Sequence, residues 1–273
     1  MKTFTRGGSA MPALGLGTWQ LTGSACERTV RAALDLGYRH LDTAQMYGNE
    51  AEVGRALAAS GVPRDDVFVT TKVWMDRLGR ADVLRSTADS LRALGTGWID
   101  LLLIHWPNPR IPLAETLGAM AELKAAGTVR QIGVSNFPVA LVRQAVEEVG
   151  AELFCDQVEY HPLLSQRPLL GELRRHGMVL TAYSPLAHGA IPREPTVARI
   201  AAKHGRTAAQ VAIAWLLAQD NVAAIPKALS ESHLRANLEA ADLTLDADDL
   251  KAMDALQGGT RTCDPGWSPR WDT

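Results

Sequence analysis

Four residues of the chain have the types and spacing needed to give a proton to a bound molecule. Asp42, Lys72 and His105 end three successive apolar runs, and Tyr47 follows Asp42 by five residues. A phenol has a pKa near 10, so it donates a proton at neutral pH most readily beside a positive charge. Lys72 would supply that charge, Asp42 would hold the lysine, and His105 would orient an oxygen atom by a hydrogen bond.

Each of these residues, taken alone, has a simpler interpretation. Strand ends lie near solvent, so a lone aspartate, lysine or histidine there is more often part of an ion pair or a satisfied polar group. The convergence of an acid, an ammonium and an imidazole on neighbouring strands, with Tyr47 beside them, favours catalysis.

The elements that must position these residues follow a βα pattern. Short apolar runs alternate with longer amphipathic stretches up to about residue 240. The expected strands are residues 13–18, 38–43, 67–73, 99–106, 129–135, 153–159, 178–184 and 222–227. Eight such units predict an α/β fold, a (β/α)8 TIM barrel that forms a single domain over residues 1–273 and gathers its strand ends at one mouth.

The two ends of the chain carry expectations of their own. Gly7 and Gly8 lie between short alternating runs, which predicts a β-hairpin that plugs the N-terminal end of the barrel. The C-terminal tail GWSPRWDT is expected to pack its two tryptophans, and it could fold over the mouth. The segment from Gly15 to Gln20 lacks the third glycine of a dinucleotide-binding turn, so a nucleotide site must be built differently.

Composition limits the classes of partner. Of 273 residues 47% are hydrophobic and 21% charged, as in ordinary globular proteins, and the net charge of −2 gives no surplus of cations for nucleic acid or anionic lipid. No apolar run is long enough to span a bilayer, and the N-terminus lacks a signal core. Cys26, Cys155 and Cys263 are expected to be reduced thiols in a cytoplasmic protein. We expect a monomer that binds a small molecule.

Longer motifs, in order and spacing, resemble those of the aldo-keto reductases over essentially the whole chain. They are GLGTW (15–19), GYRHLDTAQMYGNEAEVG (37–54), TTKVW (70–74), DLLLIHWP (100–107), IGVSNF (132–137), QVEYHP (157–162), AYSPLAHG (182–189) and IPKA (225–228). The resemblance implies reduction of an aldehyde or ketone to an alcohol: NADPH delivers hydride to the carbonyl carbon, and Tyr47 protonates the oxygen.

The same resemblance implies a cofactor site across the strand ends. Its residues are Thr18, Trp19, Asp42, Ser135, Asn136, Gln157, Tyr183, Ser184, Pro185, Leu186, Lys227, Ala228, Ser230, His233, Arg235 and Asn237. In this site Ser135, Asn136 and Gln157 bind the carboxamide and Tyr183 stacks on the nicotinamide. Taken alone, Tyr183 would more often be a packing residue, and Ser135 with Asn136 would cap the helix beginning near Pro138.

The cofactor site departs from the family pattern at two positions. Ala228 and His233 stand where many members have a serine and an arginine for the 2′-phosphate. Lys227 and Arg235 are two nearby cations, which favour a doubly charged group over a ribose hydroxyl. NADPH is therefore the expected cofactor and NADH the alternative.

Tryptophans at three strand ends predict an apolar substrate wall. Trp19, Trp74 and Trp106 would lie beside Tyr47 and His105. The connection after Trp106 is short compared with the long substrate loops of mammalian aldo-keto reductases, so the resemblance implies an open pocket. The sequence most resembles small bacterial members of the 2,5-diketo-gluconic acid reductase B type, which implies small dicarbonyls such as methylglyoxal or diketo sugar acids, and aromatic aldehydes, as substrates. No metal is expected, because the histidines His161, His188 and His204 lack metal-ligand spacing and suit surface or loop positions.

Two other functions stay open. In a barrel aldolase or isomerase, Lys72 would form a Schiff base and Tyr47 would act as acid or base. That reading explains the lysine but not the cofactor residues. A non-catalytic, cofactor-sensing barrel is the second alternative, and the intact group of four residues argues against it.

Overall fold

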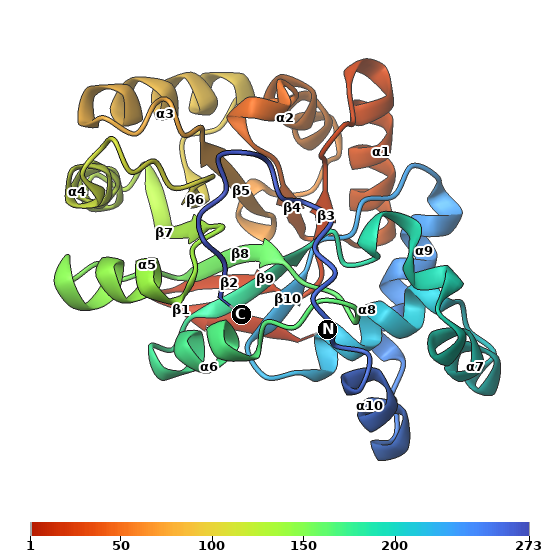
Figure 1. Cartoon of the computed structure of the whole chain (residues 1–273). Coiled ribbons are helices and arrows are strands. Elements are labelled where there is room, and N and C mark those ends of the chain that lie inside the picture. Colours follow the sequence, from red (N-terminus) through yellow and green to blue (C-terminus); the bar gives the residue numbers. More distant parts are fainter. Residues whose placement is uncertain (1, 273) are drawn as a thin grey trace.

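The computed structural model describes residues 2–272 and contains the expected barrel. Eight parallel strands form one sheet in the order β10-β9-β8-β7-β6-β5-β4-β3, surrounded by helices (Figure 1). They are β3 (Leu16–Gly17), β4 (His40–Asp42), β5 (Phe68–Val73), β6 (Ile99–Ile104), β7 (Val129–Ser135), β8 (Cys155–Glu159), β9 (Val179–Tyr183) and β10 (Val222–Ala224). All eight predicted strands are present. The first and last are shorter than predicted, since β3 starts at Leu16 and β10 ends before Ile225.

A seam between the first and last strands closes the sheet into a barrel. Leu14 forms a parallel bridge with Ala224, and the Gly15 amide donates to the Ala224 oxygen at 2.9 Å. Gly17 lies so close to this seam that a Cβ atom there would be 2.6 Å from the backbone oxygen of Ile225. Only glycine allows the two strands to approach this far, so the GLGTW motif serves barrel closure as well as the mouth.

Helices cover the outer face of the barrel. They are α1 (Gly23–Leu36), α2 (Glu50–Ala59), α3 (Arg80–Leu94), α4 (Leu113–Ala125), α5 (Val139–Arg143), α6 (Arg167–Arg175), α7 (Pro195–His204), α8 (Ala208–Ala218), α9 (Glu231–Glu239) and α10 (Ala247–Asp254). Because helices pack outside and side chains fill the inside, every residue of β5 and β6 is buried. Between residues 2 and 272, no helix has the length and apolar character to cross a membrane.

The predicted hairpin lies under the barrel. β1 (Thr3–Arg6) pairs antiparallel with β2 (Ser9–Pro12), and both turn glycines, Gly7 and Gly8, have positive φ angles. Met11 of β2 packs among buried side chains near the starts of strands, including Phe68 and Phe154. The hairpin therefore plugs the N-terminal end, as predicted, and leaves the opposite end for chemistry.

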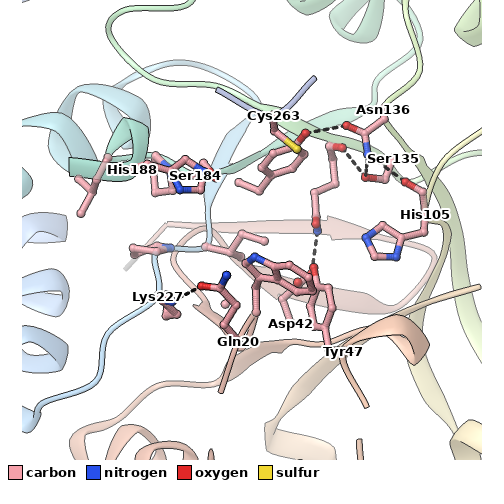
Figure 2. A pocket seen from close by; sticks show the side chains of 18 of the residues that line it. Gln20, Asp42, Tyr47, His105, Ser135, Asn136, Ser184, His188, Lys227 and Cys263 are labelled. Carbon is pink, nitrogen blue, oxygen red and sulfur yellow. Dashed lines mark hydrogen bonds between the residues drawn. The ribbon is translucent and has the colours of Figure 1, made fainter. Parts of the chain in front are cut away.

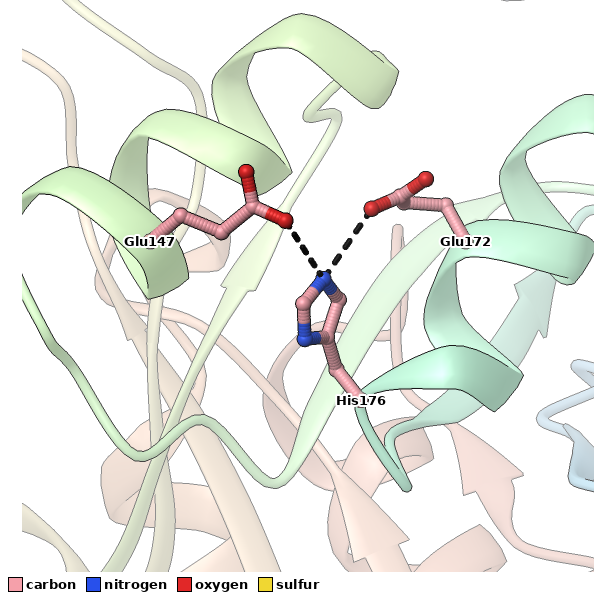
Figure 3. Close-up of side chains that lie close together, drawn as sticks. All are labelled: Glu147, Glu172 and His176. Carbon is pink, nitrogen blue, oxygen red and sulfur yellow. Dashed lines mark hydrogen bonds and ion pairs between the residues drawn. The ribbon is translucent and has the colours of Figure 1, made fainter.

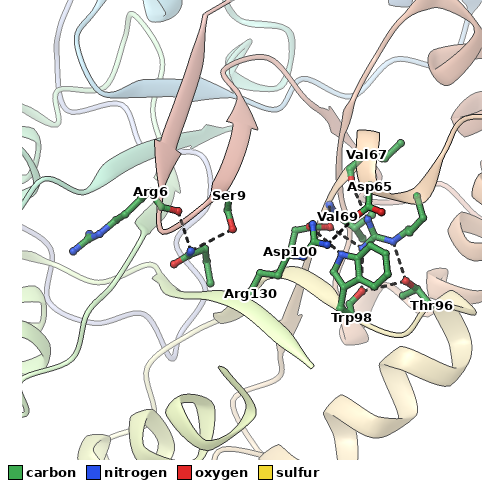
Figure 4. A network of polar contacts seen from close by, with 11 residues as sticks. Arg6, Ser9, Asp65, Val67, Val69, Thr96, Trp98, Asp100 and Arg130 are labelled. Carbon is green, nitrogen blue, oxygen red and sulfur yellow. Dashed lines mark hydrogen bonds and ion pairs between the residues drawn. The ribbon is translucent and has the colours of Figure 1, made fainter. Parts of the chain in front are cut away.

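A buried aspartate anchors the strand starts at this closed end (Figure 4). Asp100 accepts hydrogen bonds from Arg64 at 2.7 Å, from Arg130 at 3.2 Å and from the Val69 amide at 3.0 Å. Both guanidinium groups lie over the Trp98 ring, Arg64 at 4.6 Å and Arg130 at 4.4 Å from its centroid. Trp98 is thus a packing residue that also orders two cations.

We expect Asp100→Ala to lower the free energy of unfolding by about 3–5 kcal/mol, because it removes the only carboxylate among residues 2–272 that pairs with the Arg64 guanidinium in this buried network. Urea unfolding monitored by tryptophan fluorescence measures this loss. Exchange of Asp65, the exposed partner of Arg130, for alanine is the control and should change stability by less than about 1 kcal/mol. Equal losses in the two variants would contradict the role given to Asp100.

Candidate active site

A cavity of about 390 Å³ opens at the carboxyl ends of the strands (Figure 2). Most of the residues predicted for the site line it: Trp19, Asp42, Tyr47, His105, Trp106, Ser135, Asn136, Gln157, Tyr183, Ser184, Pro185, Leu186 and Lys227. They come from segments up to about 200 residues apart, so the barrel topology gathers them.

The four residues predicted to act on a proton are neighbours. Lys72 Nζ lies 2.5 Å from Asp42 Oδ1 and 3.5 Å from the Tyr47 hydroxyl oxygen. The Tyr47 and His105 rings meet edge to face, with centroids 5.6 Å apart. Asp42 and Lys72 are fully buried, whereas Tyr47 is half-buried against the cavity. The buried ion pair thus lies beneath a tyrosine that borders the cavity.

A buried asparagine fixes the turn that carries Tyr47. Tyr47 ends the short 3-10 helix Gln45–Tyr47, and Asn49 follows it. The Asn49 side chain accepts a hydrogen bond from Thr43 at 2.6 Å and donates two, each of 2.9 Å, to carbonyls of the loop after β3. The same loop carries Trp19, whose ring centroid is 4.8 Å from that of Tyr47. Asn49 therefore ties together two loops that face the cavity.

Burial and charge set the protonation of this group. Burial raises the pKa of Tyr47 above its ordinary value, and the Lys72 charge offsets only part of that rise. Burial lowers the pKa of Lys72, but Asp42 and Tyr47 together outweigh it and hold this pKa above its ordinary value. Burial, helped by the Lys72 charge, lowers the pKa of His105 well below its usual range. At neutral pH the site contains a protonated phenol, an ammonium and a neutral imidazole.

Amide and hydroxyl groups cover the opposite side of the cavity. Asn136 donates to the His105 oxygen at 2.9 Å and accepts from the Tyr183 hydroxyl at 2.8 Å, and Gln157 donates to Asp42 Oδ2 at 2.7 Å. Ser135 donates to the Gln157 oxygen at 2.7 Å. The alternative that Ser135 and Asn136 cap a helix is wrong, because α5 has Pro138 at its N-cap and no side-chain cap hydrogen bond.

Comparison with known proteins decides the family. The model of the Aldo/keto reductase family matches residues 13–257. The chain belongs to the aldo/keto reductase family. It is therefore an oxidoreductase, and the resemblance of its motifs to this family is confirmed.

Relatives within the aldo/keto reductases match over nearly the full length. Methylglyoxal reductase DkgB of Escherichia coli O157:H7 is 42% identical over 267 residues, which is 96% of this chain and 100% of the relative. An aldo-keto reductase of Mycobacterium avium is 43% identical, over 92% of this chain and 88% of the relative. The crystal structure of a proposed 2,5-diketo-D-gluconic acid reductase B has a TM-score of 0.97 at 43% identity, over 100% of this chain and 98% of that one. The predicted likeness to this type of aldo/keto reductase is confirmed.

Some residues predicted for the site lie away from the cavity wall. Thr18 is fully buried and donates to the Asp42 oxygen at 2.9 Å, so it supports the strand end from behind. Trp74 packs edge to face on His105, with centroids 5.2 Å apart. Five further residues also lie outside the lining of this cavity: Ala228, just before α9, and Ser230, His233, Arg235 and Asn237, at its start or within it. Of these, Arg235 is exposed and Asn237 is buried.

Six side chains that the sequence did not assign to the aldo/keto reductase site line its cavity: Gln20, Met46, His188, Ile225, Pro226 and Cys263. Gln20 accepts a hydrogen bond from Lys227 at 3.1 Å, and His188 lies 3.2 Å from the Ser184 hydroxyl. Gln20 and Met46 are each next to a predicted site residue in the sequence, so they could have been included in the prediction. Cys263 carried no such signal, because it lies in the tail, far in sequence from every motif.

Two of the histidine predictions need correction. His188 was given no role, but it lines the cavity. His161 was expected at the surface or in a loop without a role, but it is fully buried, and its Nε2 lies 3.1 Å from the Glu159 carboxylate. The QVEYHP motif of this aldo/keto reductase therefore contributes a second buried polar group after Gln157, the pair of Glu159 and His161.

A cluster of possible metal ligands lies outside the barrel, at Glu147, Glu172 and His176 (Figure 3). Arg143 and Arg175 each contact the Glu172 carboxylate, at 2.8 and 2.7 Å, and Arg175 also contacts Glu147. Two guanidinium groups already neutralise the two carboxylates, which favours an ion-pair network joining α6 to the π-helix Gln144–Glu148 rather than a cation site.

Proposed function

We propose that this aldo/keto reductase uses NADPH to reduce small aldehydes and ketones, with Tyr47 as the proton donor. The observation that carries the proposal is the placement of the Tyr47 hydroxyl, at the cavity and 3.5 Å from Lys72 Nζ. A protonated phenol next to a buried ammonium is a proton source whose conjugate base is stabilised as it forms.

Each residue of the group has a separate task. Tyr47 gives its proton to the carbonyl oxygen, and the Lys72 ammonium stabilises the resulting phenolate. Asp42 holds Lys72 in place, and the Lys72 contact to the Thr43 oxygen at 2.8 Å fixes the same ammonium from a second side. His105, being neutral, offers an N–H that positions the carbonyl oxygen toward Tyr47.

From one end of the cavity to the other, the chemical character of the lining residues matches successive parts of a dinucleotide. Asn136 and Gln157 offer amides at one end, and the Tyr183 ring provides a flat face for stacking. At the other end Lys227 provides a cation suited to phosphates, with the His188 ring beside it. When bound, the nicotinamide supplies a hydride to the carbonyl carbon. Lys227, together with the exposed Arg235, supports NADPH ahead of NADH.

Small dicarbonyls and aromatic aldehydes are the proposed substrates. Trp19, Met46 and Trp106 give the cavity an apolar wall near Tyr47. The relatives named methylglyoxal reductase and 2,5-diketo-D-gluconic acid reductase support carbonyls next to a second polar group.

The alternative of a Schiff-base aldolase is less well supported. Lys72 is fully buried, and its ammonium is bound by Asp42 and by the Thr43 oxygen, so it is neither deprotonated nor open to attack a carbonyl. Borohydride added with a carbonyl compound would label Lys72 if the aldolase reading were correct, and we expect no label.

The decisive test is a panel of methylglyoxal, a diketo sugar acid and aromatic aldehydes, assayed with NADPH and with NADH. We expect loss of the reduced-nicotinamide absorbance with several of these carbonyls, and a higher kcat/KM with NADPH. No oxidation with either cofactor across the panel would refute the reductase proposal, whereas a preference for NADH would refute only the assignment of Lys227 and Arg235.

A further inference from the structure

The last residues of the described chain cross the mouth of the barrel. Residues 258–272, which we call the C-terminal strap, run over the strand ends after α10 (dark blue in Figure 1). The strap starts beside the loop after β8, where Ser165 donates to the Gly258 oxygen at 3.0 Å and Thr260 donates to the Leu163 oxygen at 3.2 Å. It then passes Cys263, which lines the cavity (Figure 2).

The far part of the strap rests on the opposite side of the mouth. The Trp267 ring meets Trp74 edge to face at 6.4 Å, and Trp271 meets Trp106 at 6.0 Å. The strap therefore connects the β8 side of the mouth with the sides of β5 and β6, where the predicted substrate wall lies. The end of the strap is held by a hydrogen bond from the Val139 amide to Asp272 at 2.9 Å. The strap is also attached to the barrel at a fixed point between these contacts and its start.

One buried carboxylate supplies that fixed point. Glu159, the last residue of β8, is fully buried. Its Oε1 accepts from the Thr262 amide at 2.8 Å and from the Thr262 hydroxyl, and its Oε2 accepts from the Cys263 amide at 2.9 Å. His161 contacts the same carboxylate from the barrel side at 3.1 Å. Three donors of the strap thus meet one side chain of the barrel.

The charge of Glu159 suits this task. Burial would raise the pKa of its carboxyl group, but the donors of His161, Thr262 and Cys263 outweigh burial and lower it to about 2. The group is thus ionised at any pH at which a reductase is normally assayed. Hydrogen bonds to a charged acceptor are stronger than those between neutral groups, and Glu159 makes several with consecutive residues.

We propose that Glu159 is a positioning residue whose carboxylate latches the C-terminal strap to β8, so that the strap forms one wall of the substrate cavity. Glu159 does not touch the reacting atoms; it acts through Thr262 and Cys263. The latch itself stands on geometry alone, and only its effect on substrate binding rests on the proposed function.

The latch can be tested without any turnover, because the cysteines report on it. Cys26 and Cys155 are buried and Cys263 is partly exposed, so a thiol reagent added to the folded protein reports on Cys263. In Glu159→Gln the amide group turns an N–H toward a backbone donor, and the strap should open more often. Burial, together with the Glu159 charge, raises the pKa of Cys263, so labelling is followed across pH and the rate of the fully ionised thiol is compared. We expect this limiting rate to be on the order of ten to a hundred times higher in this variant than in the wild type.

Two further variants make this result interpretable. Thr262→Val removes a single donor and no buried charge, and it should increase the labelling rate less than Glu159→Gln does. Glu172→Gln is the matched control: this carboxylate is also buried, but its partners are Arg143, Arg175 and His176 rather than the strap. Its labelling rate should equal that of the wild type. Unchanged labelling in both Glu159→Gln and Thr262→Val would overturn the latch.

Steady-state kinetics then test whether the C-terminal strap forms a wall of the substrate cavity. With a small carbonyl substrate, Glu159→Gln should raise KM at least about tenfold, while kcat and the Kd of the cofactor measured by fluorescence change by less than about threefold. Faster labelling with an unchanged KM would overturn the substrate wall and leave the latch standing. If the wild type reduced no carbonyl at all, the proposed function would fail, and the labelling result would still decide on Glu159.

Discussion

Replacing Tyr47 with phenylalanine is expected to abolish measurable carbonyl reduction, lowering kcat by about 10²–10⁴-fold, while the Kd of NADPH stays within about twofold. Only the proton donor is lost, since phenylalanine keeps the ring that packs against Trp19 and His105. Steady-state kinetics with methylglyoxal or an aromatic aldehyde measures the first effect. Quenching of protein fluorescence by NADPH measures the second.

A companion variant distinguishes Tyr47 from its neighbour. His105→Gln keeps a hydrogen-bond donor but alters its geometry, so it should raise the KM for the carbonyl and retain part of kcat. If Tyr47→Phe retained full turnover and His105→Gln lost it, the acid would be His105. The lowered pKa of His105 argues against that result, because a neutral imidazole is a weak proton donor.

Lys72→Met should have the second large effect, on both stability and activity. The substitution leaves Asp42 as a buried carboxylate without its cation, which costs about 3–5 kcal/mol in the free energy of unfolding. It also removes the charge that stabilises the Tyr47 phenolate, so kcat should fall by at least about a hundredfold. Urea unfolding and steady-state kinetics on the same preparation measure the two losses.

The double variant Asp42→Asn with Lys72→Met separates these losses. Asparagine removes the stranded charge, so much of the lost stability should return, while activity stays low because the ammonium is still missing. Recovery of activity together with stability would mean that Lys72 serves the fold alone. If the single variant Lys72→Met were as stable and as active as the wild type, both the structural and the catalytic role of Lys72 would be contradicted.

The fold could be predicted because its signals are local. The strands are short apolar runs buried on both faces, and the glycines of the hairpin turn are adjacent in sequence. The strand ends were harder to place: Pro226 has no amide hydrogen to continue a ladder, and β10 already ends at Ala224. The core of the site was also predictable, because Asp42, Lys72 and His105 end strands, and the barrel topology brings the carboxyl ends of the strands together at one mouth.

The remaining parts of the site depend on contacts between distant segments. Cys263 lies at the cavity in a segment whose amide donates to Glu159, 104 residues earlier, and no periodicity reports such a contact. His161 looked like a loop residue because its buried partner, Glu159, is identified only in three dimensions. The residues of α9 were placed by resemblance alone, and the structure sets them outside the cavity.

The hairpin of β1 and β2 has a practical consequence for handling the protein. Since it closes the end of the barrel opposite the mouth, a tag, fusion partner or solid support joined ahead of Thr3 would lie away from the opening. The same attachment at the other end of the chain would sit beside Trp271, against the strap. Immobilisation through the first residues therefore leaves the cavity facing solution, and it is the orientation to choose for a sensor or a flow reactor.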